Sequence, residues 1–132
     1  MRKLILFGQS DFGRVMMDCV RAISTLEEED GVYCLDGSDI EQFRTNLNSI
    51  CNTVYKKDSL LILCDSPNSP LVREAWLVLE KRGLIGKMIM VCGVNVPCVQ
   101  AALAYKDEIE SDEQLEQVLK AQTQSGVTVY RL

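Results

Sequence analysis

The stretch Leu60-Leu61-Ile62-Leu63-Cys64-Asp65 decides the fold of this chain. Its five apolar residues follow one another without polar alternation, which is typical of a parallel strand covered on both faces. After Asp65, Ser69-Pro70 opens a segment with apolar residues at helical spacing, and Gly83 closes it. The spacing is carried by Leu71, Ala75, Val78 and Leu79. The sequence therefore predicts a strand over 60–64 and a helix that begins after Ser69.

Three further apolar runs have the same character. They are Lys3 to Phe7, Val32 to Leu35 and Lys87 to Cys92. Helical patterns also cover residues 12–26, 40–54, 96–105 and 111–124. This alternation predicts one α/β domain over residues 1–132, a doubly wound sheet of four parallel strands flanked by helices. The β-branched segment Val127 to Leu132 is predicted to be a short C-terminal edge strand, which a dimer could share.

Two of the helical patterns allow more detailed predictions. Residues 12–26 place five apolar side chains on one stripe, the arrangement of a helix that packs on a sheet. These are Val15, Met16, Cys19, Ile23 and Leu26. The acidic run Glu27 to Asp30 opposes the helix dipole, so a frayed helix end is expected there. Ser111 and Gln114 form a capping-box pattern at the start of the last helix.

The composition is that of an ordinary globular protein, with 47% hydrophobic and 25% charged residues among 132. A formal net charge of −5 argues against nucleic-acid binding, because phosphate contacts need clustered Lys and Arg. No apolar run reaches the roughly 18 residues of a membrane span. Six cysteines without a sign of secretion indicate a reduced, cytoplasmic protein. Four of them are expected to behave as small hydrophobes in apolar stretches: Cys34, Cys64, Cys92 and Cys98.

The chain contains no histidine. This absence removes the commonest general base near neutral pH, the commonest metal ligand and any phosphohistidine. The sequence therefore predicts neither a metal site nor a cofactor.

Polar residues follow each predicted strand. In open α/β sheets, ligands bind beyond the carboxyl ends of the strands, where the strand order reverses. The four strand ends are Gly8 to Asp11, Asp36 to Asp39, Asp65 to Ser69 and Gly93 to Asn95. We therefore expect a crevice that presents carboxylates, hydroxyls and amides. Its candidate residues are Gly8, Gln9, Ser10, Asp11, Asp65, Ser66, Asn68, Ser69 and Asn95.

The first of these loops does not fit a known phosphate-binding motif. Gly8 and Gly13 have the spacing of a Walker A loop, but Arg14 and Val15 stand where the motif needs Lys and Ser or Thr. Ser10 occupies the place of the second glycine of the dinucleotide fingerprint. Both nucleotide-binding functions are therefore disfavoured.

Asp65 is the best single candidate for an active carboxylate, which would orient or stabilise a partner in the crevice. The alternative, which the residue pattern favours, is a loop Asp that accepts hydrogen bonds from nearby backbone N–H groups. Ser69 is explained as a helix N-cap, and Asn95 as a turn and helix-entry residue. Cys64 and Cys92 are expected to be core residues rather than nucleophiles, because the sequence places no His or Lys beside them.

Taken in order, these segments resemble enzyme IIA of the mannose/fructose/sorbose class of the bacterial phosphoenolpyruvate-dependent sugar phosphotransferase system, over nearly the whole chain. Gly93-Val94-Asn95-Val96-Pro97 is similar to the family's Gly-Val-Asn-Ile/Leu-Pro segment. Leu61 to Asp65, followed by Ser69-Pro70, is similar to the family's third strand and its Gly-Gly-Ser/Thr-Pro helix entry. In some members a C-terminal antiparallel strand completes the sheet of a dimer partner, a role that Val127 to Leu132 could fill.

The resemblance implies a phosphoryl relay. In the family, a His just after the first strand takes phosphate from the phosphocarrier protein HPr and gives it to enzyme IIB, and an Asp at the third strand end orients that His. These positions fall here on Ser10 and Asp65. Asp11 replaces the Gly that usually follows, and the Gly-Gly of the third loop has become Asn68 with one residue fewer. A serine hydroxyl needs a base to attack, and its phosphate ester is too stable to pass the group on.

Three hypotheses follow, and the sequence leaves them open. The first is a non-phosphorylatable homodimeric IIA-like protein that binds or regulates enzyme IIB or an HPr-like phosphocarrier, next to a membrane sugar permease. The second is an active phosphotransfer component that uses Asp11, Ser10 or a cysteine in place of histidine. The third is a receiver-like phospho-Asp domain with Asp65 and Asp11, which would also need a Lys after a fifth parallel strand.

Overall fold

The computed structural model describes residues 1–23 and 31–131. Four strands form one parallel sheet in the order β2-β1-β3-β4. The strands are β1 (Arg2–Phe7), β2 (Val32–Leu35), β3 (Ser59–Cys64) and β4 (Met88–Cys92). The helices are α1 (Phe12–Ile23), α2 (Ile40–Cys51), α3 (Pro70–Lys81), α4 (Val96–Tyr105) and α5 (Asp112–Ser125), with a short 3-10 turn at Ile85–Lys87. The prediction of an α/β fold with four parallel strands is confirmed.

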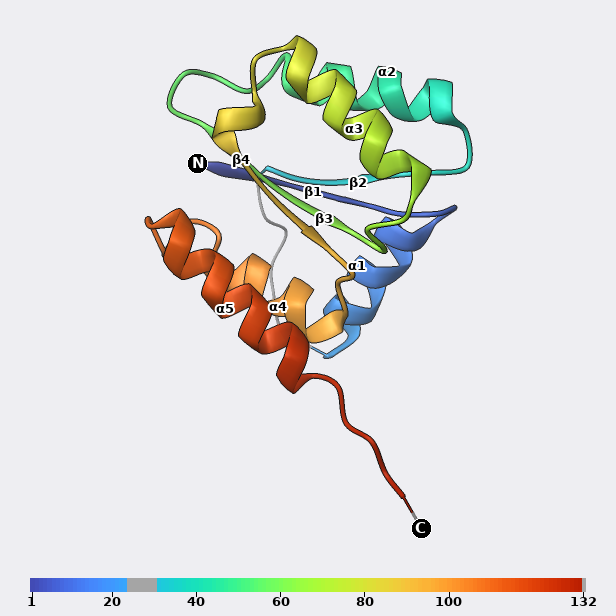
Figure 1. The fold of residues 1–132 in the computed structure, drawn as a ribbon, viewed down its shortest axis with the longest axis vertical. Coiled ribbons are helices and arrows are strands. Elements are labelled where there is room, and N and C mark those ends of the chain that lie inside the picture. The colour runs from blue at the N-terminus through green and yellow to red at the C-terminus, as the bar shows by residue number, and fades with distance from the viewer. Residues whose placement is uncertain (24–30, 132) are drawn as a thin grey trace.

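Helices cover both faces of the sheet, α2 and α3 one face and α1, α4 and α5 the other (Figure 1). The apolar runs supply both layers, because successive side chains of a strand point to opposite faces. In β1, Leu4 and Leu6 belong to the core under α1, α4 and α5, whereas Ile5 and Phe7 belong to the core under α2 and α3. Burial on both faces explains why these strands lack polar alternation.

Helix starts agree with the sequence prediction. Ser69 caps α3 by accepting a hydrogen bond from the Leu71 N–H, with Pro70 as the first helical residue. Asn95 caps α4 in the same way, and Ser111 accepts from the Gln114 N–H at the start of α5. Of the helices in the described part of the chain, none is long and apolar enough to cross a membrane.

The predicted buried stripe of the first helix is wrong except at Met16, which is half-buried against the core. Val15 and Ile23 are 50% and 63% exposed, and Cys19 is also exposed. The helix instead buries Gly13, Met17 and Val20. Gly13 explains this choice, since a Cβ atom there would lie only 2.5 Å from the Leu6 carbonyl oxygen, so the glycine side of α1 is the one that meets β1. Leu26 and the acidic run 27–30 lie outside the described residues.

Two further expectations are corrected. Residues 127–131 form no strand and extend away from the two layers (Figure 1), because a single segment has no ladder partner within the described chain; residue 132 is not described. Cys34 is exposed rather than buried, since β2 is an edge strand that α1 covers only in part. The predicted burial holds for Cys64 and Cys98, and Cys92 is half-buried.

Candidate functional site

Three loops meet at the carboxyl edge of the sheet, where the strand order reverses between β1 and β3. The Gln9 N–H, in the loop after β1, donates a 2.9 Å hydrogen bond to Asp65 Oδ2, in the loop after β3. The Gly37 N–H, in the loop after β2, donates a 2.9 Å bond to the Ser10 carbonyl oxygen. The loop that carries Ser10 is thus held from both sides by the two neighbouring loops.

Glycines make this close meeting of loops possible. A Cβ atom on Gly8 would lie 2.7 Å from Asp65 Cγ, so the Asp65 carboxylate reaches the Gln9 N–H across a residue without a side chain. A Cβ atom on Gly37 would lie 1.9 Å from the Gly8 carbonyl oxygen. Both distances are shorter than any van der Waals contact, so a side chain at either position would force the loops apart.

Only one of the two carboxylate oxygens of Asp65 has a hydrogen-bond partner among the described residues. Its Oδ2 accepts from Gln9, whereas its buried Oδ1 has no hydrogen-bond partner among the described residues. A buried oxygen without a donor costs about 1–3 kcal/mol, so this atom is an acceptor that the described residues leave unused. The expected role of a loop Asp bound by backbone is found, but its donor belongs to the first loop rather than to its own.

Ser10 lies at the tip of the first loop with an exposed side chain. Its φ of 52° is in the left-handed region, which is uncommon for a residue other than glycine. A hollow of about 400 Å³ opens beside it, and half of its lining residues belong to α1. The lining residues are Gln9, Ser10, Asp11, Phe12, Val15, Met16, Cys19 and Val96. The exposed apolar side of α1 therefore continues directly into the Ser10 loop.

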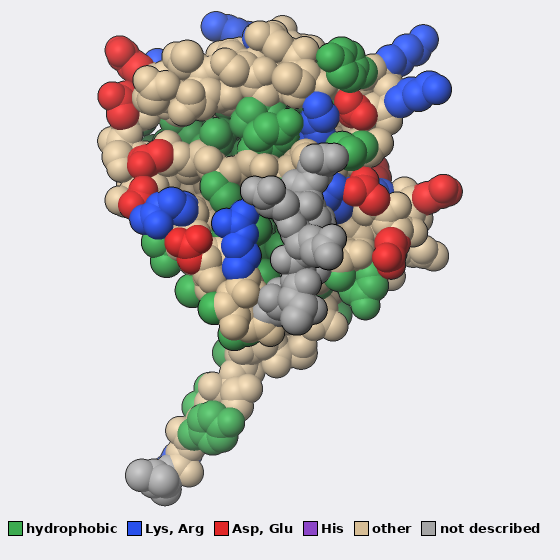
Figure 2. Space-filling model, turned by 180° about the vertical axis from the view of Figure 1, so that it is seen from behind, with side chains coloured by type: hydrophobic (Ala, Val, Ile, Leu, Met, Phe, Trp, Pro, Cys, Tyr) green, Lys and Arg blue, Asp and Glu red, His purple; other side chains and the backbone are tan. Residues whose placement is uncertain are grey.

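The Asp11 carboxylate is held in an ion pair and is not free to accept phosphate. It forms a 2.9 Å ion pair with Arg14, which also pairs with Asp18 at 3.2 Å along the exposed side of α1. Figure 2 shows basic and acidic side chains interspersed on the face behind that of Figure 1. Charges that neutralise one another in this way leave little field to attract a polyanion.

The structure places Ser66, Asn68 and Ser69 together in the loop between β3 and α3. Ser66 Oγ accepts from the Asn68 N–H at 3.3 Å, and Ser69 is buried as the cap of α3. Asn95 is occupied structurally, since its Oδ1 accepts from the Cys98 N–H and its Nδ2 donates to the Thr123 carbonyl oxygen. Asn95 thus joins the start of α4 to the end of α5.

Asp36 is a site residue that the sequence did not single out. A hollow of about 280 Å³ lies between it and Asp11, lined also by Arg14, Cys34 and Leu35. Hydrogen bonds from Ser38 lower the pKa of Asp36 below its ordinary value, with a smaller contribution from Asp11. The signal that could have found it is Gly37, since Asp36 lies between this glycine and the last residue of the second strand.

Comparison with known families identifies the family of this chain. The family model EIIA-man, described as "PTS system fructose IIA component", matches residues 31–119. The chain belongs to this family. It is a IIA-like component of a sugar phosphotransferase system, and membership implies interaction with other components such as IIB or HPr. The matched range begins after the loop that carries Ser10.

Solved structures share the fold at low sequence identity, and at such identities the likeness shows the fold alone. EIIA from Streptococcus agalactiae superposes with a TM-score of 0.81 at 14% identity, covering 98% of this chain and 97% of that chain. The mannose/sorbose specific IIA subunit from Enterococcus faecalis gives 0.78 at 19%, covering 99% and 96%. The IIA protein associated with the fucose utilization operon of Streptococcus pneumoniae gives 0.72 at 14%, covering 97% and 92%. None of the curated proteins compared with the chain matches it.

The receiver-like hypothesis gains no support from this architecture. A receiver would need a Lys after a fifth parallel strand, and the described residues form four strands only. The first two hypotheses both fit a IIA-like scaffold and differ in whether Ser10, Asp11 or a cysteine accepts phosphate.

Proposed function

We propose that this chain is a cytoplasmic IIA-like protein that does not accept phosphate and instead binds or regulates enzyme IIB or an HPr-like phosphocarrier through the Ser10 crevice. The proposal rests on Ser10, to which the resemblance assigns the place of the family's phospho-accepting histidine. The observation that supports it is that Asp65, which binds the Gln9 N–H just before Ser10, keeps one oxygen without a partner among the described residues. Free thiols at all six cysteines support a reducing compartment.

The chemistry of Ser10 argues against a relay. A histidine ring attacks phosphorus as the neutral imidazole and yields a reactive phosphoramidate, whereas a serine hydroxyl needs a base and yields a stable ester. Asp65 is the candidate base that the resemblance assigns, but even after such an attack the phosphate would not be passed on. A protein with this site can bind the relay partners without taking part in transfer.

The geometry around Ser10 supports a former histidine site. Histidine is enriched among non-glycine residues in the left-handed region, so the backbone at Ser10, with φ of 52°, suits it. Asp65 Oδ1 has no donor among the described residues, and an imidazole N–H at position 10 would be the kind of group that supplies one.

The test is phosphorylation with radiolabelled phosphoenolpyruvate, enzyme I and HPr. We expect no label on the wild-type chain and an acid-labile, stoichiometric label on Ser10→His. Label on wild type that is lost in Ser10→Ala, Asp11→Asn or a cysteine variant would replace the proposal with the active phosphotransfer hypothesis. If Ser10→His also stays unlabelled while remaining folded and bound to HPr, the equivalence of Ser10 with the family histidine is wrong.

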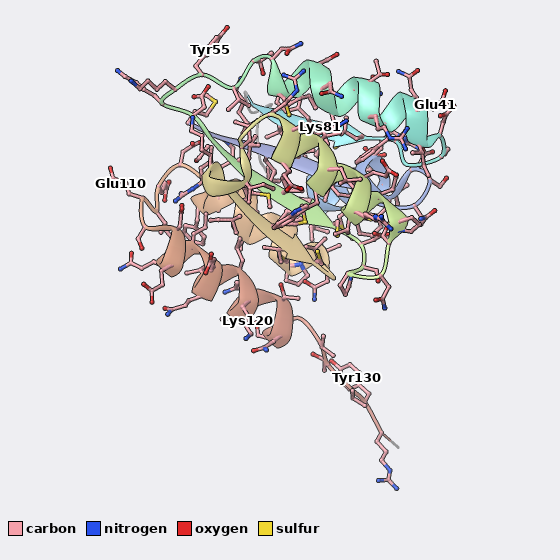
Figure 3. The ribbon with its side chains drawn as sticks, turned by 45° about the horizontal axis from the view of Figure 1, so that its top comes forward. Glu41, Tyr55, Lys81, Glu110, Lys120 and Tyr130 are labelled. Atoms are coloured by element: carbon pink, nitrogen blue, oxygen red, sulfur yellow. The ribbon has the colours of Figure 1, made fainter. Side chains whose placement is uncertain are left out.

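We also propose that the chain works as a homodimer in which residues 127–132 pair with the partner's sheet. Val129 and Tyr130 are 86% and 92% exposed, and Tyr130 lies well away from the helices (Figure 3). β4 is a sheet edge, and exposed edges invite pairing with another chain. Light scattering on the full chain and on a chain ending at Gly126 tests this: we expect a dimer and a monomer. A monomeric full chain, or a dimer that survives truncation, would contradict it.

A further inference from the structure

Two thiols face each other at the carboxyl ends of β3 and β4. Cys64 and Cys92 are direct Cα partners in the parallel ladder. Both side chains lie on the sheet face under α2 and α3, Cys64 in the core and Cys92 packed against it. Strands in a sheet lie about 4.8 Å apart, and the Cα atoms of disulfides are usually about 4.4–6.8 Å apart. The backbone therefore already holds this pair within reach of a covalent bond.

The two cysteines differ in exposure, and exposure decides which of them an oxidant from solution meets first. Cys64 is fully buried, and this burial, followed by the hydrogen bond and charge of Cys92, raises the pKa of Cys64 to about 12. Cys92 is partly exposed, since it is the last residue of an edge strand. An oxidant from solution would therefore reach Cys92 first, with the protonated Cys64 thiol already in contact with it.

The end of β4 can make the small movement that bond formation needs. Cβ atoms in disulfides lie about 3.8 Å apart, roughly 1 Å closer than the spacing of the strands. Cys92 has a strand neighbour on one side only, and Gly93, with φ of 89°, follows it at once. No other two cysteines are ladder partners in the described sheet, since Cys34 lies opposite Leu6 and the remaining three, Cys19, Cys51 and Cys98, lie in helices.

We propose that Cys64 and Cys92 form a reversible disulfide when the protein meets a hydroperoxide. The Cys92 sulfur attacks the peroxide oxygen, the O–O bond breaks, and an alcohol or water leaves, so that Cys92 becomes a sulfenic acid. The Cys64 thiol then attacks the Cys92 sulfur, the S–O bond breaks, and the hydroxyl leaves as water with the Cys64 proton. Two thiols lose two electrons in all, and the peroxide gains them.

The bond would act next to the crevice. Cys64 directly precedes Asp65, and its carbonyl oxygen accepts from the N–H groups of Gly93 and Val94. Its thiol also contacts the Ser66 carbonyl oxygen at 3.5 Å, a contact that a disulfide removes. Oxidation would therefore tie the loops after β3 and β4 to each other.

The experiment uses the full chain with the substitutions Cys19→Ser and Cys34→Ser, which remove the exposed thiols and with them disulfides between molecules. The reduced protein is treated with hydrogen peroxide, blocked with iodoacetamide under denaturing conditions and analysed by intact mass and peptide mapping. We expect a mass lower by two hydrogens before alkylation, two fewer alkylated thiols per chain after it, and a linked pair of peptides whose fragments place the bond at Cys64 and Cys92. Dithiothreitol should restore both thiols.

Matched variants separate the pair from general oxidation. Adding Cys92→Ser should abolish the mass loss, and adding Cys98→Ser, a buried thiol of the other core, should leave it unchanged. Three results on the parent protein overturn the proposal, whatever the variants do: a sulfinic acid on Cys92 with Cys64 still free, a bond mapped to another pair, or no loss of thiols before the protein unfolds.

Discussion

Gly37→Ala tests whether the three loops of the crevice are locked together as described. The new methyl group would lie 1.9 Å from the Gly8 carbonyl oxygen and 2.5 Å from Leu71 Cδ1. Leu71 is buried and has little freedom to rotate, and the Gly8 oxygen belongs to the main chain at the end of β1. The loop after β2 must therefore move outward, which also stretches the 2.9 Å bond from the Gly37 N–H to the Ser10 carbonyl oxygen.

The cost follows from these two effects. Overpacking of this kind costs about 1–3 kcal/mol, and a lost hydrogen bond costs about 1 kcal/mol. We therefore expect Gly37→Ala to lower the free energy of unfolding by about 2–4 kcal/mol, from a total that is about 5–15 kcal/mol for a domain. With a urea dependence of about 2 kcal/mol per molar, the midpoint should fall by about 1–2 M.

The assay is urea unfolding followed by far-ultraviolet circular dichroism, at equal protein concentration. Gly86→Ala is the matched control, since a Cβ atom there meets nothing within 4 Å and its φ is not positive. It should leave the free energy of unfolding within about 1 kcal/mol of wild type, on the stabilising side. If Gly37→Ala behaves like Gly86→Ala, the close approach of the loops after β1 and β2 is wrong.

Three other predictions use the same assay. Arg2→Met should lower the free energy of unfolding by about 2–4 kcal/mol, because the buried guanidinium donates to three main-chain carbonyls and a carboxylate in segment 106–112. Its control, Arg44→Ala, breaks an exposed ion pair and should barely move the urea midpoint. Asn95→Ala should cost about 2 kcal/mol, since it loses both a helix cap and the link to α5, against about 1 kcal/mol for the cap alone in Ser111→Ala. The hydrogen bond from the Tyr55 N–H, with a smaller contribution from Lys3, lowers the pKa of Asp58 in the folded state. The stability that Asp58 contributes is therefore full above the ordinary carboxyl pKa and is lost as the pH falls through the lowered value. Asp58→Asn should flatten this part of the acid-unfolding curve, and an unchanged curve would contradict the assignment.

The strands and helix starts could be predicted because each depends on short-range chemistry. Leu60 to Cys64 has no polar residue to expose, so only a strand buried on both faces accommodates it. Ser69 and Ser111 indicate where their helices begin, because their side-chain oxygens accept hydrogen bonds from backbone N–H groups of the first turn. These signals lie within a few residues of the element that they specify, so no tertiary contact is needed to read them.

The orientation of α1 could not be predicted in the same way. The helix carries two apolar stripes, one with Val15, Cys19 and Ile23 and one with Met17 and Val20, and periodicity alone cannot choose between them. The choice depends on how closely the helix approaches β1, where only the hydrogen of Gly13 fits against the Leu6 carbonyl oxygen. A glycine within a helical pattern was therefore the more informative signal. For the same reason residues 127–131 could not be placed, since a strand is defined by the edge to which it binds.

The candidate site contains both kinds of feature, those that the nearby sequence predicts and those that depend on the folded chain. The composition alone shows that a phosphohistidine is impossible, and the positions of the strand ends alone predict that Ser10 and Asp65 lie at the same edge of the sheet. The bond from the Gln9 N–H to Asp65, across 56 positions of sequence, depends on the missing side chain of Gly8 and could only be seen in the folded chain. That bond satisfies one carboxylate oxygen and leaves the other buried without a donor among the described residues. Since an unpaired acceptor costs about 1–3 kcal/mol, a side chain at position 10 that donated a hydrogen bond to Asp65 Oδ1 would stabilise the crevice, whereas an anion placed there would not.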